Sequence, residues 1–219
     1  YNGFPALENV SLNLPAGRIV GLLGPNGSGK TTLIKLAAGL LTPTSGMILV
    51  DGKPIGTETK KIVSYLPEKT YLAEWMRVNQ CLDYFEDFYK DFDRARALDM
   101  LRRLNVNPEA RMKTLSKGTK EKVQLVLVMS RRAKLYLLDE PIGGVDPATR
   151  DYILSTIIGN YDEGATILIS THLIADVEKV LDEFIFLKEG RIAMHDCTDN
   201  IRETEGRSLD ELFREVFRC

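Results

Sequence analysis

The chain has 219 residues, of which 44% are hydrophobic, and its 29 Lys and Arg residues nearly balance its 31 Asp and Glu residues. That balance excludes the strong basic field that would point to nucleic acid or anionic lipid as an obligatory partner, and the length allows one α/β domain with a full core. Three widely spaced cysteines without a Cys-x-x-Cys pair argue against a disulfide framework or a zinc site, and no run approaches the roughly 20 apolar residues of a membrane-spanning helix.

The first predicted strand, residues 19–23, leads into a glycine-rich loop of the form Gly-x4-Gly-Lys-[Ser/Thr] and then into a predicted helix, residues 31–38. Glycines let such a loop turn its backbone N–H groups inward, and the helix adds the positive end of its dipole. Lys30 can then reach the β- and γ-phosphates of a nucleotide, and Thr31 can bind Mg²⁺. The predicted phosphate-binding loop consists of Gly24, Pro25, Asn26, Gly27, Ser28, Gly29, Lys30, Thr31 and Thr32.

Further apolar runs alternate with helical segments along the chain. Strands are predicted at residues 47–50, 62–66, 135–138, 166–169 and 184–187. Several of these runs lack the polar alternation of a half-exposed strand, which indicates a largely parallel sheet covered on both faces.

Between residues 67 and 132 the strand pattern disappears. Helices are predicted there at residues 75–89, 93–104 and 117–131. Another helix is predicted to follow the Asp146-Pro147 pair and to end near residue 161, and a last one, at 208–218, opens with a Ser208–Glu211 capping box. We therefore expect a single domain, residues 1–219, with a helical subdomain inserted over approximately residues 69–132.

Two acidic residues follow the predicted strand at 135–138. Asp139 and Glu140 would lie at the carboxyl edge of the sheet, where open α/β sheets bind their ligands. Adjacent carboxylates can divide the chemical work: Asp139 would hold Mg²⁺, and Glu140 would orient or deprotonate an attacking water.

Together with these residues, three further segments occur in the order found in the ATP-binding cassette (ABC) ATPase family, and essentially the whole chain resembles that family. Leu115-Ser-Lys-Gly-Thr119 is similar to the family signature, Gly143-Gly-Val-Asp146 to the D-loop, and Ser170-Thr-His172 to the switch-histidine segment. The resemblance implies a P-loop NTPase fold of class α/β, with a largely parallel central sheet, an N-terminal antiparallel β portion and the inserted helical subdomain.

The resemblance also implies an ATP site divided between two chains. Ser116 and Gly118, at the start of a predicted helix, would face the γ-phosphate held by the opposite subunit, and Asp146 would cross the same interface. His172 would contact the γ-phosphate and the attacking water. Tyr1 would stack on adenine, although a terminal residue can equally be frayed. Since the sequence starts at Tyr1 and not at Met, we expect further residues upstream.

Two positions depart from the family pattern. Glu68, after Tyr65-Leu-Pro67, occupies the Q-loop place, where most relatives carry Gln as a contact to Mg²⁺ and the attacking water. A carboxylate cannot donate as an amide does, but its charge would bind Mg²⁺ more strongly. Lys117 and Thr119 replace Gly and Gln of the signature, which leaves its Ser and Gly intact.

These features predict the ATP-hydrolysing subunit of an ABC transporter, bacterial exporter-like, on the cytoplasmic face of the membrane. Its expected partners are a second ABC subunit, identical or not, and an integral membrane subunit, without nucleic acid. The aromatic-rich segment 71–92 would help to form the docking groove for that subunit, with a rim of Asp83, Glu86 and Asp87. The alternatives are a soluble ABC ATPase that acts on DNA or ribosomes, and a sensor or immunity module in which nucleotide-dependent dimerisation is the signal.

Overall fold

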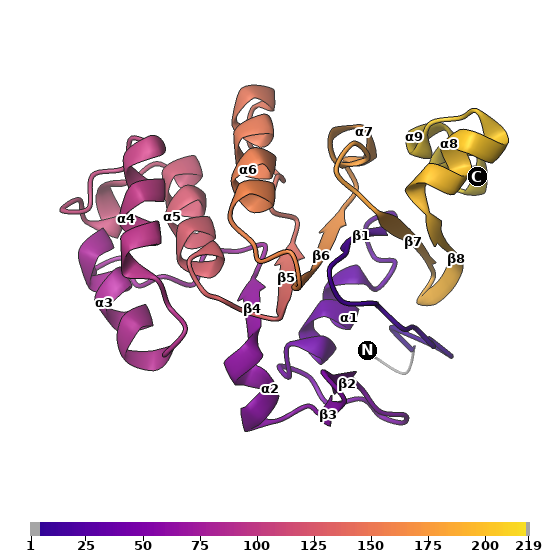
Figure 1. Ribbon diagram of the computed structural model, residues 1–219, viewed down its shortest axis with the longest axis horizontal. Coiled ribbons are helices and arrows are strands. Elements are labelled where there is room, and N and C mark those ends of the chain that lie inside the picture. Colours follow the sequence, from indigo (N-terminus) through magenta and orange to yellow (C-terminus); the bar gives the residue numbers. More distant parts are fainter. Residues whose placement is uncertain (1–4, 218–219) are drawn as a thin grey trace.

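A six-stranded sheet with the order β4-β5-β6-β1-β7-β8 runs through the computed structural model, which describes residues 5–217 (Figure 1). Its strands are β1 Ile19–Leu23, β4 Val63–Leu66, β5 Leu135–Asp139, β6 Thr166–Thr171, β7 Glu183–Lys188 and β8 Arg191–Cys197. Neighbours from β4 to β7 pair in parallel, and β8 pairs antiparallel with β7. The predicted largely parallel sheet is confirmed.

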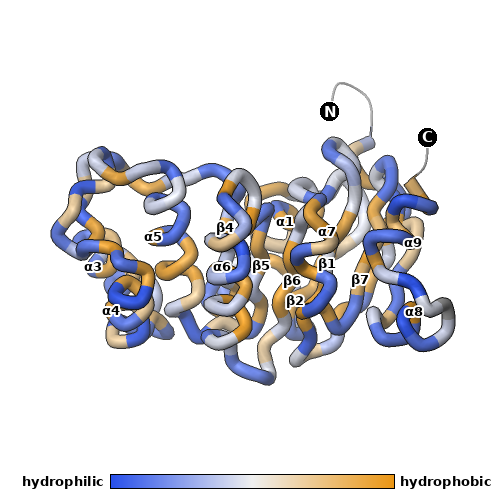
Figure 2. Tube along the Cα trace, turned by 90° about the horizontal axis from the view of Figure 1, so that it is seen from above, coloured by the Kyte–Doolittle hydropathy of each residue, from blue (hydrophilic) through white to orange (hydrophobic). Residues whose placement is uncertain are grey.

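Helices cover both faces of this sheet, which explains why its inner strands are apolar at consecutive positions. Val20 and Leu22 of β1 pack in one core cluster with Ile34, which lies on α1 (Lys30–Ala37). Ile19 and Leu23 belong to a second cluster, shared with α5 (Lys117–Met129), α6 (Pro147–Gly159) and α7 (Ile174–Val177). Figure 2 shows hydrophobic residues gathered along the central strands and hydrophilic ones along the outer helices.

The chain between β4 and β5 is helical. It contains α3 Val78–Phe88, α4 Arg94–Arg103, the short 3₁₀ helix η1 Met112–Thr114, and α5. The helix predicted at 75–89 begins three residues later, because Arg77 is extended and its N–H donates to Oε1 of Gln80, while Trp75 is 73% exposed. Fully buried Arg131 ties this region to the sheet by donating to the carbonyls of Lys61 and Val63, each at 2.6 Å.

Two hairpins depart from the predicted strands. Of the run predicted at 47–50, only β2 (Leu49–Val50) is extended, and it pairs antiparallel with β3 (Lys53–Pro54) in a separate sheet, next to α2 (Thr57–Ile62). β8, which the sequence analysis did not predict, is an edge strand whose residues alternate between exposed and partly buried. Each hairpin turn consists of an acidic residue followed by a glycine, Asp51-Gly52 and Glu189-Gly190, and all four residues have positive φ. These two dipeptides are the sequence pattern from which the hairpins could have been predicted.

The C-terminal part adds α8 (Thr198–Glu205) and α9 (Leu209–Val216). The predicted capping box is present: Ser208 Oγ accepts from the N–H of Glu211, and the Glu211 carboxylate accepts from the N–H of Ser208. Phe213 and Phe217 pack edge-on against Phe186 of β7, which docks α9 on the sheet. Within residues 5–217, no helix is both long and apolar enough to cross a membrane.

Candidate active site

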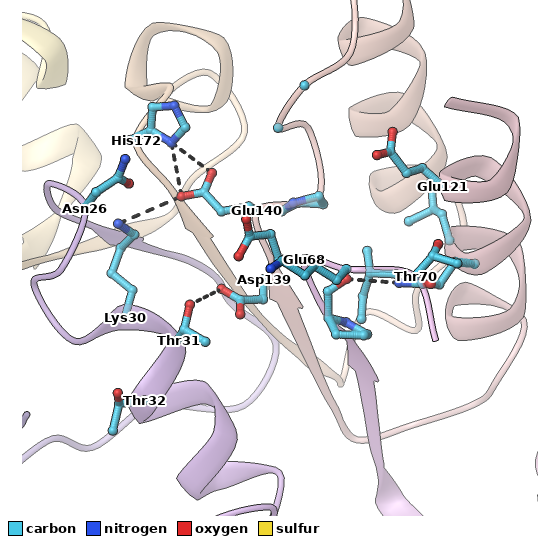
Figure 3. A pocket seen from close by; sticks show the side chains of 18 of the residues that line it. Asn26, Lys30, Thr31, Thr32, Glu68, Thr70, Glu121, Asp139, Glu140 and His172 are labelled. Atoms are coloured by element: carbon cyan, nitrogen blue, oxygen red, sulfur yellow. Dashed lines mark hydrogen bonds and ion pairs between the residues drawn. The ribbon is translucent and has the colours of Figure 1, made fainter. Parts of the chain in front are cut away.

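A cavity of about 810 Å³ opens at the carboxyl edge of the parallel strands (Figure 3). The chain leaves β1, β4, β5 and β6 at this edge, because parallel strands all end on the same side of a sheet. The predicted site residues that line the cavity are Asn26, Gly27, Gly29, Lys30, Thr31, Thr32, Glu68, Asp139, Glu140 and His172. Four separate segments therefore meet in one cavity.

The glycine-rich loop presents backbone donors to this cavity. Gly29 caps α1 with a φ of 106°, and the first intrahelical bond runs from the N–H of Leu33 to the Gly29 carbonyl, so the N–H groups of the first helical residues have no partner in the helix. A Cβ at Gly29 would lie 2.7 Å from the Ala6 carbonyl oxygen, and one at Gly24 would lie 2.4 Å from the Leu187 carbonyl oxygen. Both positions therefore require glycine.

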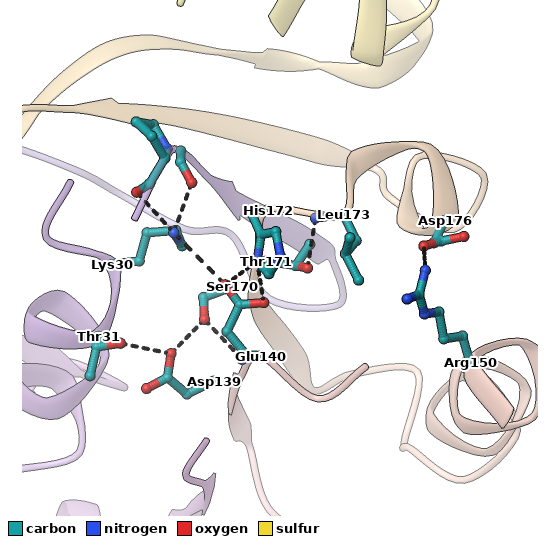
Figure 4. Close-up of polar contacts among 12 residues, drawn as sticks. Lys30, Thr31, Asp139, Glu140, Arg150, Ser170, Thr171, His172, Leu173 and Asp176 are labelled. Carbon is teal, nitrogen blue, oxygen red and sulfur yellow. Dashed lines mark hydrogen bonds and ion pairs between the residues drawn. The ribbon is translucent and has the colours of Figure 1, made fainter. Parts of the chain in front are cut away.

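Lys30 lies between the loop and the acidic residues. Its Nζ donates to the carbonyls of Gly24 at 2.8 Å and Pro25 at 3.2 Å, and it is 3.8 Å from Oε1 of Glu140 (Figure 4). Burial lowers the pKa of Lys30, whereas the carboxylates of Glu140, Asp139 and Glu68 oppose that shift. An anion bound beside this ammonium would stabilise its charged form further.

Asp139, at the end of β5, is almost completely buried. Its Oδ1 accepts from Thr31 Oγ1 at 3.1 Å and from Ser170 Oγ at 2.6 Å, while its Oδ2 is buried without a hydrogen-bond partner among the described residues. A buried carboxylate oxygen without a partner is costly, and oxygens of this kind are the ligands that Mg²⁺ prefers. The donor set at Thr31 and Asp139 therefore fits a magnesium ion.

Glu140 follows in a backbone conformation that non-glycine residues rarely adopt. Its φ is 51°, which costs roughly 1–2 kcal/mol, and it is held by bonds from its N–H to Ser170 and from the Gly143 N–H to its carbonyl. This turn directs the side chain into the cavity, where both carboxylate oxygens lie 3.1 Å from Nδ1 of His172. The pair resembles a base and its orienting partner.

Other predicted site residues lie elsewhere. Ser116 is exposed and caps α5, where its Oγ accepts from the N–H of Thr119 at 3.2 Å; neither Ser116 nor Gly118 lines the cavity. Asp146 is exposed and caps α6 through Thr149. Those bonds to Thr149 lower the pKa of Asp146. Gly24, Pro25 and Ser28 do not line the cavity, and Tyr1 falls outside the described residues.

The structure adds residues that sequence reasoning missed. Ser170 binds Asp139, as described above, and Gln124 of α5 donates through Nε2 to the Pro67 carbonyl at 2.9 Å, directly before Glu68. Gln124 is buried, and its Oε1 has no hydrogen-bond partner among the described residues. Gln124 is the only polar residue in the otherwise apolar stretch 123–129, and this is the sequence feature that could have marked it as a site residue.

Comparison with known proteins agrees with this geometry. A family model described as ABC transporter matches residues 7–143. The chain is 32% identical to the ABC-type transporter ATP-binding protein EcsA of Bacillus subtilis, over 99% of this chain and 92% of that protein. A Synechocystis ABC transporter ATP-binding protein is 31% identical over 97% of this chain, which spans 61% of that relative's length.

Solved structures agree as well. The ATP-binding subunit of an ABC transporter superimposes with a TM-score of 0.89 at 33% identity, covering all of this chain and 95% of that one. The dimeric cassette MJ0796, in a post-hydrolysis state bound to ADP and Pi, shares the fold at a TM-score of 0.79 and 22% identity, covering 89% of this chain and 91% of that one.

Proposed function

Because the chain belongs to the ABC transporter family as an ATP-binding subunit with ATPase activity, we propose that it powers an integral membrane subunit by closing as a dimer on ATP. The observation that carries the proposal is the composition of the cavity. It brings together a phosphate-binding loop, a buried lysine, a carboxylate with an unpartnered oxygen and a Glu–His pair, while the signature serine of the same chain lies outside it.

The residues of the cavity suit phosphoryl transfer to water. The Lys30 ammonium and the N–H groups of the first residues of α1, which have no partner within the helix, would hold the phosphates. Glu140 would accept a proton from the attacking water. His172 would keep the Glu140 carboxylate oriented toward that water. The strain at Glu140 supports this assignment, since such strain persists where the surrounding structure enforces it, often at functional sites.

Thr31 and Asp139 would hold Mg²⁺, with Glu68 in the lining of the same cavity. When bound, the ion would neutralise charge on the phosphate oxygens. Within residues 5–217 no three His, Cys, Asp or Glu side chains form a metal-binding group, but one or two carboxylates are enough where phosphates supply the other ligands.

The exposed position of Ser116 supports a site shared by two chains. A serine hydroxyl and the first N–H groups of α5 form an anion-binding helix start, and neither Ser116 nor Gly118 lines the nucleotide cavity of its own chain. A second copy, or a related subunit, would place this helix start over the γ-phosphate held by Lys30. Asp146 would lie in the same interface.

Glu68 tests the metal assignment at the Q-loop position. Glu68→Gln should retain ATPase activity with an altered dependence on Mg²⁺ or Mn²⁺, because the amide lacks the charge that attracts the ion, whereas Glu68→Ala should impair activity. Measuring the ATPase rate at increasing concentrations of each metal ion tests both effects. The control is Glu58→Ala, which removes an exposed acid paired with Lys61 on α2. Identical rates and metal dependence in all Glu68 variants would make Glu68 a solvated loop acid.

A groove of about 550 Å³ supports docking of a membrane subunit beside this loop. Aromatic rings of Tyr65, Tyr71, Phe85 and Tyr89 line it. The acidic residues expected at its rim, Asp83, Glu86 and Asp87, do not line it, and the first two pair with Arg94. The charged residues that line the groove are Lys35, Lys60, Lys69 and Arg131.

The lysines in the lining indicate that the partner surface carries acidic residues. Within the described residues, Lys35, Lys60 and Lys69 form no ion pair, whereas Arg131 is bound to Asp91. We therefore assign the groove to a cytoplasmic helix of the membrane subunit that carries both acidic and apolar residues. This position would hold the chain on the cytoplasmic face of the membrane.

Reversing two of these charges should separate the subunits. The double variant Lys35→Glu, Lys60→Glu should lose its multi-spanning partner on copurification from membranes but bind ATP normally, since neither lysine lines the nucleotide cavity. Lys53→Glu with Lys179→Glu is the control, because it makes the same charge change at exposed sites outside the groove. Retention of the partner by the first variant would contradict this docking site, and recovery of rRNA or DNA with the unsubstituted chain would favour the soluble ABC ATPase.

A further inference from the structure

Arg150, in the first turn of α6, bridges two segments that flank the active site. Its Nε donates to the carbonyl of Val145 in the D-loop at 3.1 Å. Its Nη1 donates to Oδ2 of Asp176 at 2.8 Å, as Figure 4 shows. Asp176 lies on α7, which begins two residues after His172. The two side chains are 24% and 34% exposed, so the ion pair is partly shielded from solvent.

Each bridged segment also contacts Glu140. On the D-loop side, the N–H of Gly143 donates to the Glu140 carbonyl at 3.0 Å. On the other side, His172 contacts the Glu140 carboxylate at 3.1 Å. Arg150 therefore closes a ring of contacts around the residue that would activate water, although it does not reach the cavity itself.

The helix after His172 depends on such outside contacts for its position. α7 has only four residues, and helices of this length are not stable alone. Arg150 holds Asp176 within this helix, while just after it Arg202 of α8 donates to the Glu178 carbonyl and the N–H of Asp210 in α9 donates to the Glu178 carboxylate. The contact with Arg150 connects α7 to the D-loop.

The two bonds require an arginine. A guanidinium presents N–H donors on several edges of one plane, so Nε and Nη1 can serve two acceptors on different segments at once. A lysine ammonium is a single point on a flexible chain.

We propose that Arg150 is a positioning residue for ATP hydrolysis, which holds the D-loop and the His172 segment together so that both contacts to Glu140 form at the same time. The inference rests on the ATPase function above, and it adds a residue outside the nucleotide cavity. Its consequence is that a change at Arg150 alters the rate of the chemical step and leaves nucleotide binding intact.

Steady-state ATPase kinetics of Arg150→Gln, Asp176→Asn and the double variant test this role. Each single variant should lower kcat about tenfold, which corresponds to a rise of ~1.4 kcal/mol in the activation free energy, while KM changes by less than about twofold. The double variant should be no slower than the slower single variant, because both changes remove the same contact. Asp176→Glu, which keeps the carboxylate, should recover most of the rate.

The matched control is Arg96→Gln. Arg96 lies on α4 and donates to the carbonyl of Asn160 at the opposite end of α6, so it also binds this helix but not the site. It should lower the melting temperature as much as Arg150→Gln does and leave kcat unchanged. Equal kcat losses in the two variants would reduce Arg150 to a structural residue.

Hydrogen exchange gives a readout that does not require hydrolysis. In Arg150→Gln, amide exchange should quicken in residues 143–146 and 172–177 together, and Asp176→Asn should show the same pattern. Unchanged exchange in residues 172–177 would overturn the inference, whatever the ATPase rate. If the unsubstituted chain failed to hydrolyse ATP, the proposed function would fail, and the exchange pattern would still decide the role of Arg150.

Discussion

Glu140→Gln is expected to bind ATP as the unsubstituted chain does but to hydrolyse it on the order of 10²–10⁴-fold more slowly, the usual contribution of a positioned general base. The carboxylate is 13% exposed, lies 3.1 Å from Nδ1 of His172 and 3.8 Å from Nζ of Lys30, and is directed into the cavity by a positive φ. An amide of the same shape keeps the packing but cannot accept a proton from water. Single-turnover phosphate release, with calorimetry for ATP affinity, separates the two effects.

The same variant should accumulate as a dimer, because hydrolysis would no longer open the ATP-bound pair. In that dimer Ser116 of each chain would close over the nucleotide held by Lys30 of the other. Adding Ser116→Arg should return the protein to monomer, since the larger side chain would replace an exposed helix cap at the interface. Light scattering should find Glu140→Gln dimeric with ATP and monomeric without it.

Glu183→Gln is the control for the loss of a buried Glu–His pair. Its carboxylate lies 2.9 Å from Nε2 of His195 and is 12% exposed, but it sits at the start of β7, the sheet edge opposite the cavity. This variant should retain its turnover. Full activity of Glu140→Gln, or a monomer at saturating Mg-ATP, would count against the proposed mechanism.

Lys30→Ala is expected to abolish tight Mg-ATP binding. A hydrogen bond to a charged group contributes about 1.5–3 kcal/mol, so removing one bond between the ammonium and a phosphate oxygen should weaken binding about 10- to 100-fold. The full effect should be larger, because the carboxylates of Asp139 and Glu140 would then face the phosphates without the ammonium between them. Calorimetry in the presence of Mg²⁺ measures the affinity directly.

Lys35→Ala is the matched control, since Lys35 lies on the same helix, α1, but lines the neighbouring groove. It should bind ATP normally. The melting temperature of both variants must be measured, because Lys30 also donates to two loop carbonyls. A folded Lys30→Ala chain with unchanged ATP affinity would refute the assignment of the phosphate-binding loop.

The sequence by itself determined the local chemistry of this protein. Loop flexibility, helix dipoles and capping depend on residues a few positions apart, so the run from Gly24 to Thr32, the Asp146 cap and the Ser208 capping box could all be identified from their spacing. Continuous apolar runs likewise indicated a parallel sheet, since only covered strands tolerate them on both faces. The edge strand β8 was missed because half-covered residues mix polar and apolar side chains.

Tertiary structure alone decided which distant residues meet. The order of the strands pairs Asp139 with Ser170, and it places Arg150 beside Asp176, 26 residues away, and Gln124 beside Pro67, 57 residues away. No local pattern encodes these pairs, because each depends on how whole elements pack across the sheet. For the same reason, the charged residues that line the groove beside α3 are basic, whereas acidic ones were expected. Lysines from α1, α2 and the loop after β4 line the groove, whereas Asp83 and Glu86 of α3 pair with Arg94 and do not line it.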